Sequence, residues 1–246
     1  MCKYRLLKVI FPVLISLSCS WIPSYLLAYR KVVVIEHPPL DWSINGQRLK
    51  DFGCEGKLQE SCPELAALGC DKITSPRFYV GGLQPPYMVV ECIHENGDPP
   101  DKDYFKKPQG LDVRYRSFAI FQDGNYKLII KRSEFKEIFA PIESVDEALS
   151  YAMAMTSLSA RYDIDPNENV AYLVREIEET HVEETADGFY VYLFDESDER
   201  MGCDMRSSFA VKVLVTRDGE VQEINRQEIY KSYSCFDFGK LTLDEE

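Results

Sequence analysis

The residues of this chain best suited to chemistry are a histidine and two glutamates near residue 180. Glu179, His181 and Glu183 alternate along the sequence, and on an extended strand alternate side chains point to one face. An imidazole between two carboxylates can hold a divalent metal ion or serve as an acid–base set. The same alternation is typical of a solvated strand face opposite a buried face with Thr180 and Val182. The sequence leaves both interpretations open.

Cysteines form the second group of reactive residues. Seven residues separate Cys54 from Cys62, and seven more separate Cys62 from Cys70. Paired zinc ligands favour gaps of about two to four residues, so this spacing does not fit a zinc site. An even number of cysteines in an exported chain instead predicts a disulfide framework. The six cysteines concerned are Cys54, Cys62, Cys70, Cys92, Cys203 and Cys235.

Hairpin geometry predicts one of these disulfides. Counted outward from a turn at Asp218 and Gly219, Cys203 and Cys235 are one residue away from facing each other. A single β-bulge corrects an offset of one residue. We therefore expect Cys203 to pair with Cys235, which leaves two disulfides among the other four cysteines. Three connectivities are open for Cys54, Cys62, Cys70 and Cys92.

The first thirty residues have the layout of an export signal. Three basic residues lie within the first eight positions, the stretch 9–17 is apolar, and small residues lie at its end, at Ser16, Ser18 and Ser20. Three outcomes fit this segment: cleavage near residues 18–20, attachment of a lipid to Cys19, or an uncleaved anchor formed by the uncharged stretch 9–29. In all three outcomes the rest of the chain leaves the cytoplasm, so the protein is secreted, periplasmic or anchored in the cell envelope.

Composition limits the classes of partner. The chain has 246 residues and a net charge of −13. A surface with this excess of negative charge repels the phosphates of nucleic acid and of anionic lipid. Nucleic-acid binding is therefore not expected, and contact with a membrane is expected only through residues 1–29 or a lipid at Cys19. The sequence holds no Gly-x-Ser-x-Gly and no His-Glu-x-x-His motif. We therefore assign no catalytic residue and no cofactor.

Three Asp-Gly pairs and one helix position these residues. The pairs at 123–124, 187–188 and 218–219 each lie between apolar alternating runs, and Asp-Gly readily adopts the positive φ angles of tight hairpins. Ser144 and Glu147 form a capping box in front of apolar residues at helical spacing up to residue 159. The run 189–194 predicts a central strand packed on both faces, or one with Tyr190 and Tyr192 exposed to a partner.

These elements predict an α+β fold. One capped helix would pack on an antiparallel sheet built from hairpins, within a domain spanning residues 111–246. Residues 30–110 contain four of the six cysteines, three Pro-Pro pairs and one Gly-Gly pair, which predicts a loop-rich N-terminal part stapled by disulfides. Residues 1–29 form the signal or anchor.

Two segments of the C-terminal part resemble uncharacterised exported bacterial proteins of unknown function. The segments are residues 135–152 (FKEIFAPIESVDEALSYA) and 209–221 (FAVKVLVTRDGEV). The order of helix and sheet is also similar to that of PepSY-like and cystatin-like domains. The chain lacks the Gln-x-Val-x-Gly loop of cystatins, so the resemblance does not imply protease inhibition. It covers residues 111–246 and implies no functional residues.

The sequence therefore favours an exported, disulfide-stabilised binding protein with a protein or peptide partner. An open antiparallel edge would let it take up a peptide strand. The alternative is an extracytoplasmic hydrolase or metal-binding enzyme that uses the region around His181. A purely structural envelope component is a third interpretation.

Overall fold

The computed structural model describes part of the chain, including most of its second half. Residues 1–29 with Cys19, and the cysteines Cys54 and Cys62, lie outside the described residues. Within the described part, no helix is both long and apolar enough to cross a bilayer. The described residues are 32–41, 63–74, 81–94, 99, 102–105, 115–166, 170–196 and 203–235.

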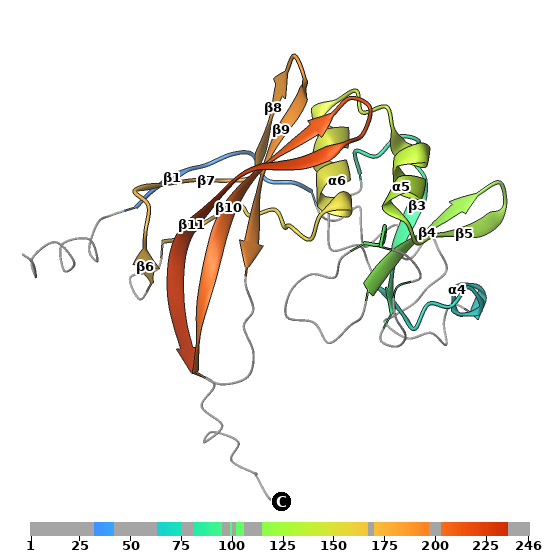
Figure 1. The fold of residues 1–246 in the computed structure, drawn as a ribbon, viewed down its shortest axis with the longest axis horizontal. Helices are drawn as coiled ribbons and strands as arrows, with labels where there is room; N and C mark the ends of the chain where they lie inside the picture. The colour runs from blue at the N-terminus through green and yellow to red at the C-terminus, as the bar shows by residue number, and fades with distance from the viewer. Residues whose placement is uncertain are drawn as a thin grey trace, which may run out of the picture.

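Antiparallel sheets dominate the structure (Figure 1). A five-stranded sheet has the order β6 (Ala171–Tyr172), β11 (Val221–Cys235), β10 (Cys203–Thr216), β9 (Gly188–Glu196), β8 (His181–Thr185). A four-stranded sheet has the order β2 (Lys72–Thr74), β3 (Met88–His94), β4 (Tyr115–Gln122), β5 (Asn125–Ile129). A parallel pair joins β1 (Val33–Ile35) to β7 (Glu176–Glu178).

The described residues contain three helices, so the prediction of a single capped helix is not confirmed. They are α4 (Pro63–Ala67), α5 (Arg132–Phe139) and α6 (Val145–Met155). In α5 the Glu134 carboxylate accepts a hydrogen bond from the backbone amide of Lys131, at 3.2 Å. Helix α5 was not predicted from the sequence, because lysine is not a usual N-cap residue and the helix begins shortly after strand β5.

Helix α6 begins where the capping box predicts. The Ser144 hydroxyl accepts from the Glu147 amide at 3.2 Å, and the Glu147 carboxylate accepts from the Ser144 amide at 2.8 Å. The helix ends at Met155 instead of continuing to residue 159. Arg116 donates to the carbonyls of Ala154 and Thr156, which satisfies acceptors that the end of a helix leaves open.

All three Asp-Gly pairs lie at hairpins, as predicted. Asp123 and Gly124 both have positive φ, 52° and 80°, and form the two-residue turn between β4 and β5. In the hairpin of β8 and β9 the turn is one residue earlier, because Gly188 already pairs with Thr185. A β-carbon at Gly188 would lie 2.2 Å from the Val215 carbonyl oxygen, so this glycine allows a close approach between strands.

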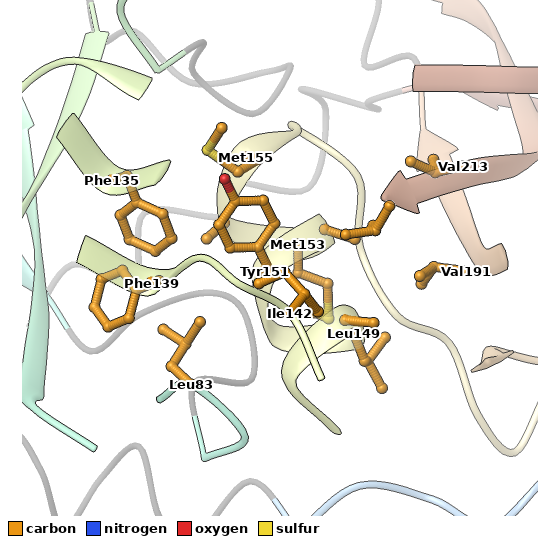
Figure 2. Close-up of a cluster of buried hydrophobic side chains, with 14 of the residues drawn as sticks. Leu83, Phe135, Phe139, Ile142, Leu149, Tyr151, Met153, Met155, Val191 and Val213 are labelled. Carbon is orange, nitrogen blue, oxygen red and sulfur yellow. The ribbon is translucent and has the colours of Figure 1, made fainter. Parts of the chain in front are cut away.

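Helix α6 lies between the two sheets and supplies the centre of the main core (Figure 1). In Figure 2, Tyr151 and Met153 of α6 lie between Phe135 of α5 on one side and Val213 on the other. One face of β9 and β10 turns toward α6, with buried side chains at alternate positions: Phe189, Val191, Leu193, Val211, Val213 and Val215. The opposite face of this sheet is called the outer face below.

The four-stranded sheet joins the two parts predicted from the sequence. Strands β2 and β3 come from residues 30–110, and β4 and β5 come from residues 111–246. Strand β3 pairs with β4 over all seven of its residues, from Met88 opposite Phe121 to His94 opposite Tyr115. The predicted division at residue 110 therefore falls between two paired strands.

One disulfide lies within the described residues, between Cys70 and Cys92. Both cysteines are buried in a small core with Leu65, Ile73 and Val90. This bond is one of the pairs that the sequence left open. Cys54 and Cys62 lie outside the described residues, so their pairing stays open.

The long hairpin of β10 and β11 places the backbones of Cys203 and Cys235 directly opposite each other. The register shifts twice on the way from the turn, between Ser208 and Phe209 and between Lys212 and Val213. The pairing predicted from the sequence required one bulge and a two-residue turn at 218–219. A disulfide between Cys203 and Cys235 stays a prediction.

Candidate functional site

Two histidines far apart in sequence meet one glutamate at the junction of β7 and β8. His37 follows β1, Glu178 ends β7, and His181 begins β8. The Oε1 atom of Glu178 lies 3.4 Å from Nε2 of His181 and 3.7 Å from Nε2 of His37. One potential ligand atom from each residue lies within 4.8 Å of the others. These three residues are called the His–Glu–His cluster below.

Ring stacking orders the imidazoles of this cluster. The His181 ring stacks on the Tyr192 ring of β9 with centroids 4.0 Å apart, and the His37 ring stacks on the other ring face of His181, also at 4.0 Å. His181 and Tyr192 are register partners in neighbouring strands, so the sheet fixes the lower part of the stack. The parallel pairing of β1 with β7 brings His37 to the top.

Glu179, which the sequence placed among the metal ligands, has a different position. Its carboxylate is buried and accepts from the backbone amides of His37 at 3.0 Å and Ile164 at 2.9 Å. The strand alternation predicted from the sequence does not reach residue 179, because the chain turns between the end of β7 and the start of β8. Glu179 therefore holds His37 in place instead of facing the same way as His181.

Glu183 shares the outer face with His181, as predicted, but belongs to a second network. Its carboxylate accepts from the Tyr192 hydroxyl at 2.9 Å, and that hydroxyl accepts from Nζ of Lys212 at 2.6 Å. Lys212 also lies over the Tyr190 ring at 4.0 Å. The hydrogen bond to Tyr192 raises the pKa of Lys212, and burial raises the pKa of the Tyr192 hydroxyl. Both groups therefore stay protonated at neutral pH.

The outer face is partly exposed where Tyr190 and Tyr192 lie. Strand β9 is central in its sheet, as predicted, since it pairs with both β8 and β10. Its face toward α6 is fully buried, whereas Tyr190 and Tyr192 are only partly buried. Each of the two interpretations of this strand therefore holds in part, since Phe194 on the same outer face is buried against Ile177 and Ile229.

A groove of about 180 Å³ lies on the outer face beside the cluster. Its walls are the β1–β7 pair and strands β9 to β11. Glu178 and Tyr192 belong both to the groove and to the surroundings of the imidazoles. The residues that line it, some through their backbone, are Ile35, Glu176, Ile177, Glu178, Tyr192, Leu193, Ala210, Val211, Lys212, Asn225, Gln227 and Ile229.

A second cavity, of about 270 Å³, lies where the end of α6 meets β10 and β11. It combines apolar walls with two arginines. Arg226 is already paired, with Asp195 at 2.5 Å and with Glu223 at 2.9 Å. The lining residues are Arg132, Met155, Thr156, Ser157, Leu158, Val213, Val221, Glu223 and Arg226.

The sequence pointed to His181 but gave no local signal for its partners. His37 stands alone after a three-residue strand, and Glu178 is one of many glutamates in an acidic chain. Only the pairing of β1 with β7 brings them together. The one feature of the sequence that could have indicated the pair is the small number of histidines, three in the whole chain.

Comparisons with models of protein families, with curated proteins and with solved structures give no match to this chain.

Proposed function

We propose that this chain is an exported, disulfide-stabilised binding protein that takes up an extended segment of a protein partner as an added strand. The strand adds to the outer edge of β11, residues 221–228. The observation that carries the proposal is a long edge strand with a cavity beside each of its two faces. Export is supported by the signal-like N-terminus and by the buried disulfide between Cys70 and Cys92.

Strand β11 offers a long edge. It has 15 residues and pairs with β10 on one side, whereas β6 covers the other side only at Tyr230 and Lys231. Among the described residues, no strand pairs with β11 on that side between Val221 and Glu228. Such an edge presents backbone donors and acceptors that an incoming strand can use.

The two cavities give this edge a way to select side chains. Asn225 and Gln227 line the groove on the outer face, whereas Val221 and Glu223 line the cavity near α6. Because successive side chains of a strand point to opposite faces, an added strand would direct neighbouring residues toward the two cavities. Backbone hydrogen bonds then supply affinity, and the cavities supply specificity.

Charges on the edge favour a specific partner over self-association. Glu223 and Arg226 form an ion pair, and charged side chains on an edge strand oppose uncontrolled pairing with other copies. Between them Ile224 is 44% exposed, which leaves one apolar contact point on a polar edge. We expect a partner segment with apolar residues at neighbouring positions.

Site-specific photo-crosslinking in the native host tests the proposal. The photoreactive residue p-benzoylphenylalanine is placed at Ile224 on the β11 edge and, as a matched control, at the exposed Lys127 on the β5 edge of the other sheet. We expect a discrete adduct from position 224 that position 127 does not give. Ala210→Leu, which fills the groove on the outer face, should reduce the adduct. Equal adducts at both positions, or none at either, would contradict strand addition.

The intact mass of the exported protein tests the rest of the proposal. A mature chain that begins near residue 19 or 21 indicates cleavage, and an added lipid mass at Cys19 indicates an envelope lipoprotein. Peptide mapping without reduction should recover Cys203 linked to Cys235 and Cys70 linked to Cys92. Thiols at these positions that react with an alkylating agent would contradict the proposed disulfides.

The alternative function is an extracytoplasmic hydrolase or metal-binding enzyme centred on His181. The His–Glu–His cluster supports the metal-binding half of that alternative. Hydrolysis of p-nitrophenyl acetate by the zinc-loaded chain, lost in His181→Ala, would favour an enzyme over a binding protein.

A further inference from the structure

We propose that His37, Glu178 and His181 bind a divalent transition-metal ion of the zinc or cobalt type. This site is separate from the β11 edge and does not depend on strand addition. It rests on the positions of three ligand atoms, on the tautomer of His181, and on a buried nitrogen of His37.

Hydrogen bonding fixes which nitrogen of His181 is available. Its Nδ1 atom lies 2.8 Å from the backbone carbonyl oxygen of Glu179. A carbonyl only accepts, so Nδ1 carries the proton and Nε2 of the neutral ring carries a lone pair. A histidine that donates through one nitrogen to a backbone carbonyl and offers the other to a metal is the usual arrangement of metal-binding histidines.

The Nε2 atom of His181 lies 3.4 Å from Oε1 of Glu178. When the ring is neutral, its nitrogen lone pair and the carboxylate oxygen repel each other, and a cation placed between them removes that repulsion. Nε2 of His37 is buried and makes no hydrogen bond to any residue that the structure describes. Burying a polar nitrogen without a hydrogen-bond partner or a metal ion costs free energy. One cation between the three atoms satisfies all of them.

The ligand types select the class of metal. Two imidazoles and one carboxylate suit zinc, cobalt, nickel or iron(II), whereas calcium and magnesium prefer oxygen ligands. Sets of two histidines and one glutamate bind zinc in four-coordinate sites that keep one position for water or a ligand. Glu178 also lines the groove on the outer face, so the fourth position of the metal would be near that groove.

Metal binding requires a small rearrangement of the cluster. The His37 and His181 rings are nearly parallel, with 11° between their planes, and both must tilt to aim Nε2 at one ion. Donor atoms now spread over 4.8 Å must approach to about 3.4 Å, the separation set by bonds of about 2.1 Å in a tetrahedron. Glu178 is 41% exposed, so its side chain can move without disturbing the core.

Glu179 acts as a positioning residue for this site. Its buried carboxylate accepts the backbone amide of His37, and its backbone carbonyl accepts Nδ1 of His181. One residue therefore orients both imidazoles from behind. Residues in this outer position typically change metal affinity by about 10–100-fold, so we expect Glu179→Gln to weaken binding without abolishing it.

Isothermal titration with Zn²⁺ tests the proposal. The metal-free full chain carries no polyhistidine tag, is kept in mild detergent with its disulfides intact, and has any free thiol alkylated so that cysteine cannot bind the ion. We expect one Zn²⁺ per chain. His37→Ala and His181→Ala should each raise the Kd more than about 100-fold, and Glu178→Gln about 10-fold or more.

Glu183→Gln is the matched control. Glu183 lies on the outer face close to His181 but is bonded to Tyr192 and Lys212, so its loss should change the Kd less than about 3-fold. The visible spectrum of the Co²⁺-loaded chain provides a second readout of the ligand set, and thermal unfolding of each metal-free variant checks that it folds. An unchanged Kd in His37→Ala, or a larger loss from Glu183→Gln than from Glu178→Gln, would overturn the proposal.

Discussion

The molecule contains the same pair of stacked rings twice, once in each large sheet. His94 of β3 stacks on Tyr115 of β4 with centroids 4.1 Å apart, and His181 of β8 stacks on Tyr192 of β9 with centroids 4.0 Å apart. In both cases the two residues are register partners in antiparallel strands. The backbone arrangement is therefore alike, and the two regions differ in what meets the ring nitrogens.

In the four-stranded sheet the histidine has a satisfied partner. Nε2 of His94 lies 2.7 Å from the Ser117 hydroxyl, and the residue is only 4% exposed. Burial lowers the pKa of His94 below its ordinary value, although the Asp71 carboxylate opposes part of this shift. The ring is therefore neutral near pH 7 and acts as part of the core.

In the five-stranded sheet the histidine faces a carboxylate and a second imidazole. Nothing in the strand pairing itself distinguishes His181 from His94. The difference comes from the segment after β1, which brings His37 onto the stack. A histidine on a sheet is therefore a candidate metal ligand when segments distant in sequence bring other ligand atoms close to its second ring nitrogen.

Removing a carboxylate should have opposite consequences in the two regions. Glu91, three residues before His94 in β3, is fully buried and lies 3.5 Å from the buried guanidinium of Arg116. Glu91→Gln removes the charge of this buried ion-pair partner, and we expect the free energy of unfolding to fall by about 3–5 kcal/mol. Glu178→Gln should change it by less than about 0.5 kcal/mol without metal. Urea unfolding measures both, and similar losses would contradict the comparison.

Removing the disulfide should damage one region and spare the other. Cys92 is the register partner of Ser117, which contacts His94. We expect the double variant Cys70→Ala and Cys92→Ala to lose about 3 kcal/mol of stability, because its unfolded chain regains the conformational entropy of an open loop. Its affinity for Zn²⁺ should stay within about threefold of the parent value. A large loss of zinc affinity in a folded variant would indicate that the regions are coupled.

Removing one hydroxyl group beside each ring stack should destabilise the chain by different, smaller amounts. Ser117→Ala leaves the buried Nε2 of His94 without its partner, which should cost about 1–3 kcal/mol. Tyr192→Phe removes a hydroxyl that is only partly buried and interacts with Lys212 and Glu183, and we expect a cost below about 1 kcal/mol. Thermal unfolding at neutral pH compares the two variants. A larger cost for Tyr192→Phe would contradict the assignment of the buried stack as structural.

The smallest expected effect is a dependence on pH through His94. Since its pKa is lower in the folded chain, the unfolded chain binds more protons as the pH falls through about 6.5. The contribution of His94 to stability is therefore present above that pH and is lost on acidification toward the lowered pKa. Between about pH 7.5 and about pH 5, His94→Gln should lose less stability than the parent chain. Equal losses would show that His94 is not held neutral.

Local signals in the sequence predicted much of the framework. The three hairpins and the capping box at Ser144 were confirmed because each depends on a few neighbouring residues, although only Asp123 and Gly124 form the two-residue turn as predicted. The four-stranded sheet was not predicted, since β3 and β4 are separated by a long segment whose length hides their pairing. Helix α5 was missed because its N-cap lysine gives no start signal.

The candidate site was predicted only at its centre. His181 and Glu183 do share the outer face, since they pair with Tyr192 and Tyr190. The partners His37 and Glu178 depend on contact between β1 and β7, more than 140 positions apart in sequence. No local pattern encodes such a contact, so the sequence placed Glu179 where the structure places Glu178.

Long-range ¹H–¹⁵N spectra of the imidazoles test the comparison most directly. The chain has only three histidines, so each ring can be followed separately when one equivalent of Zn²⁺ is added to the metal-free chain. We expect the Nε2 resonances of His37 and His181 to shift together while that of His94 stays unchanged. Shifts confined to His94, or an absence of change at all three rings, would contradict this expectation.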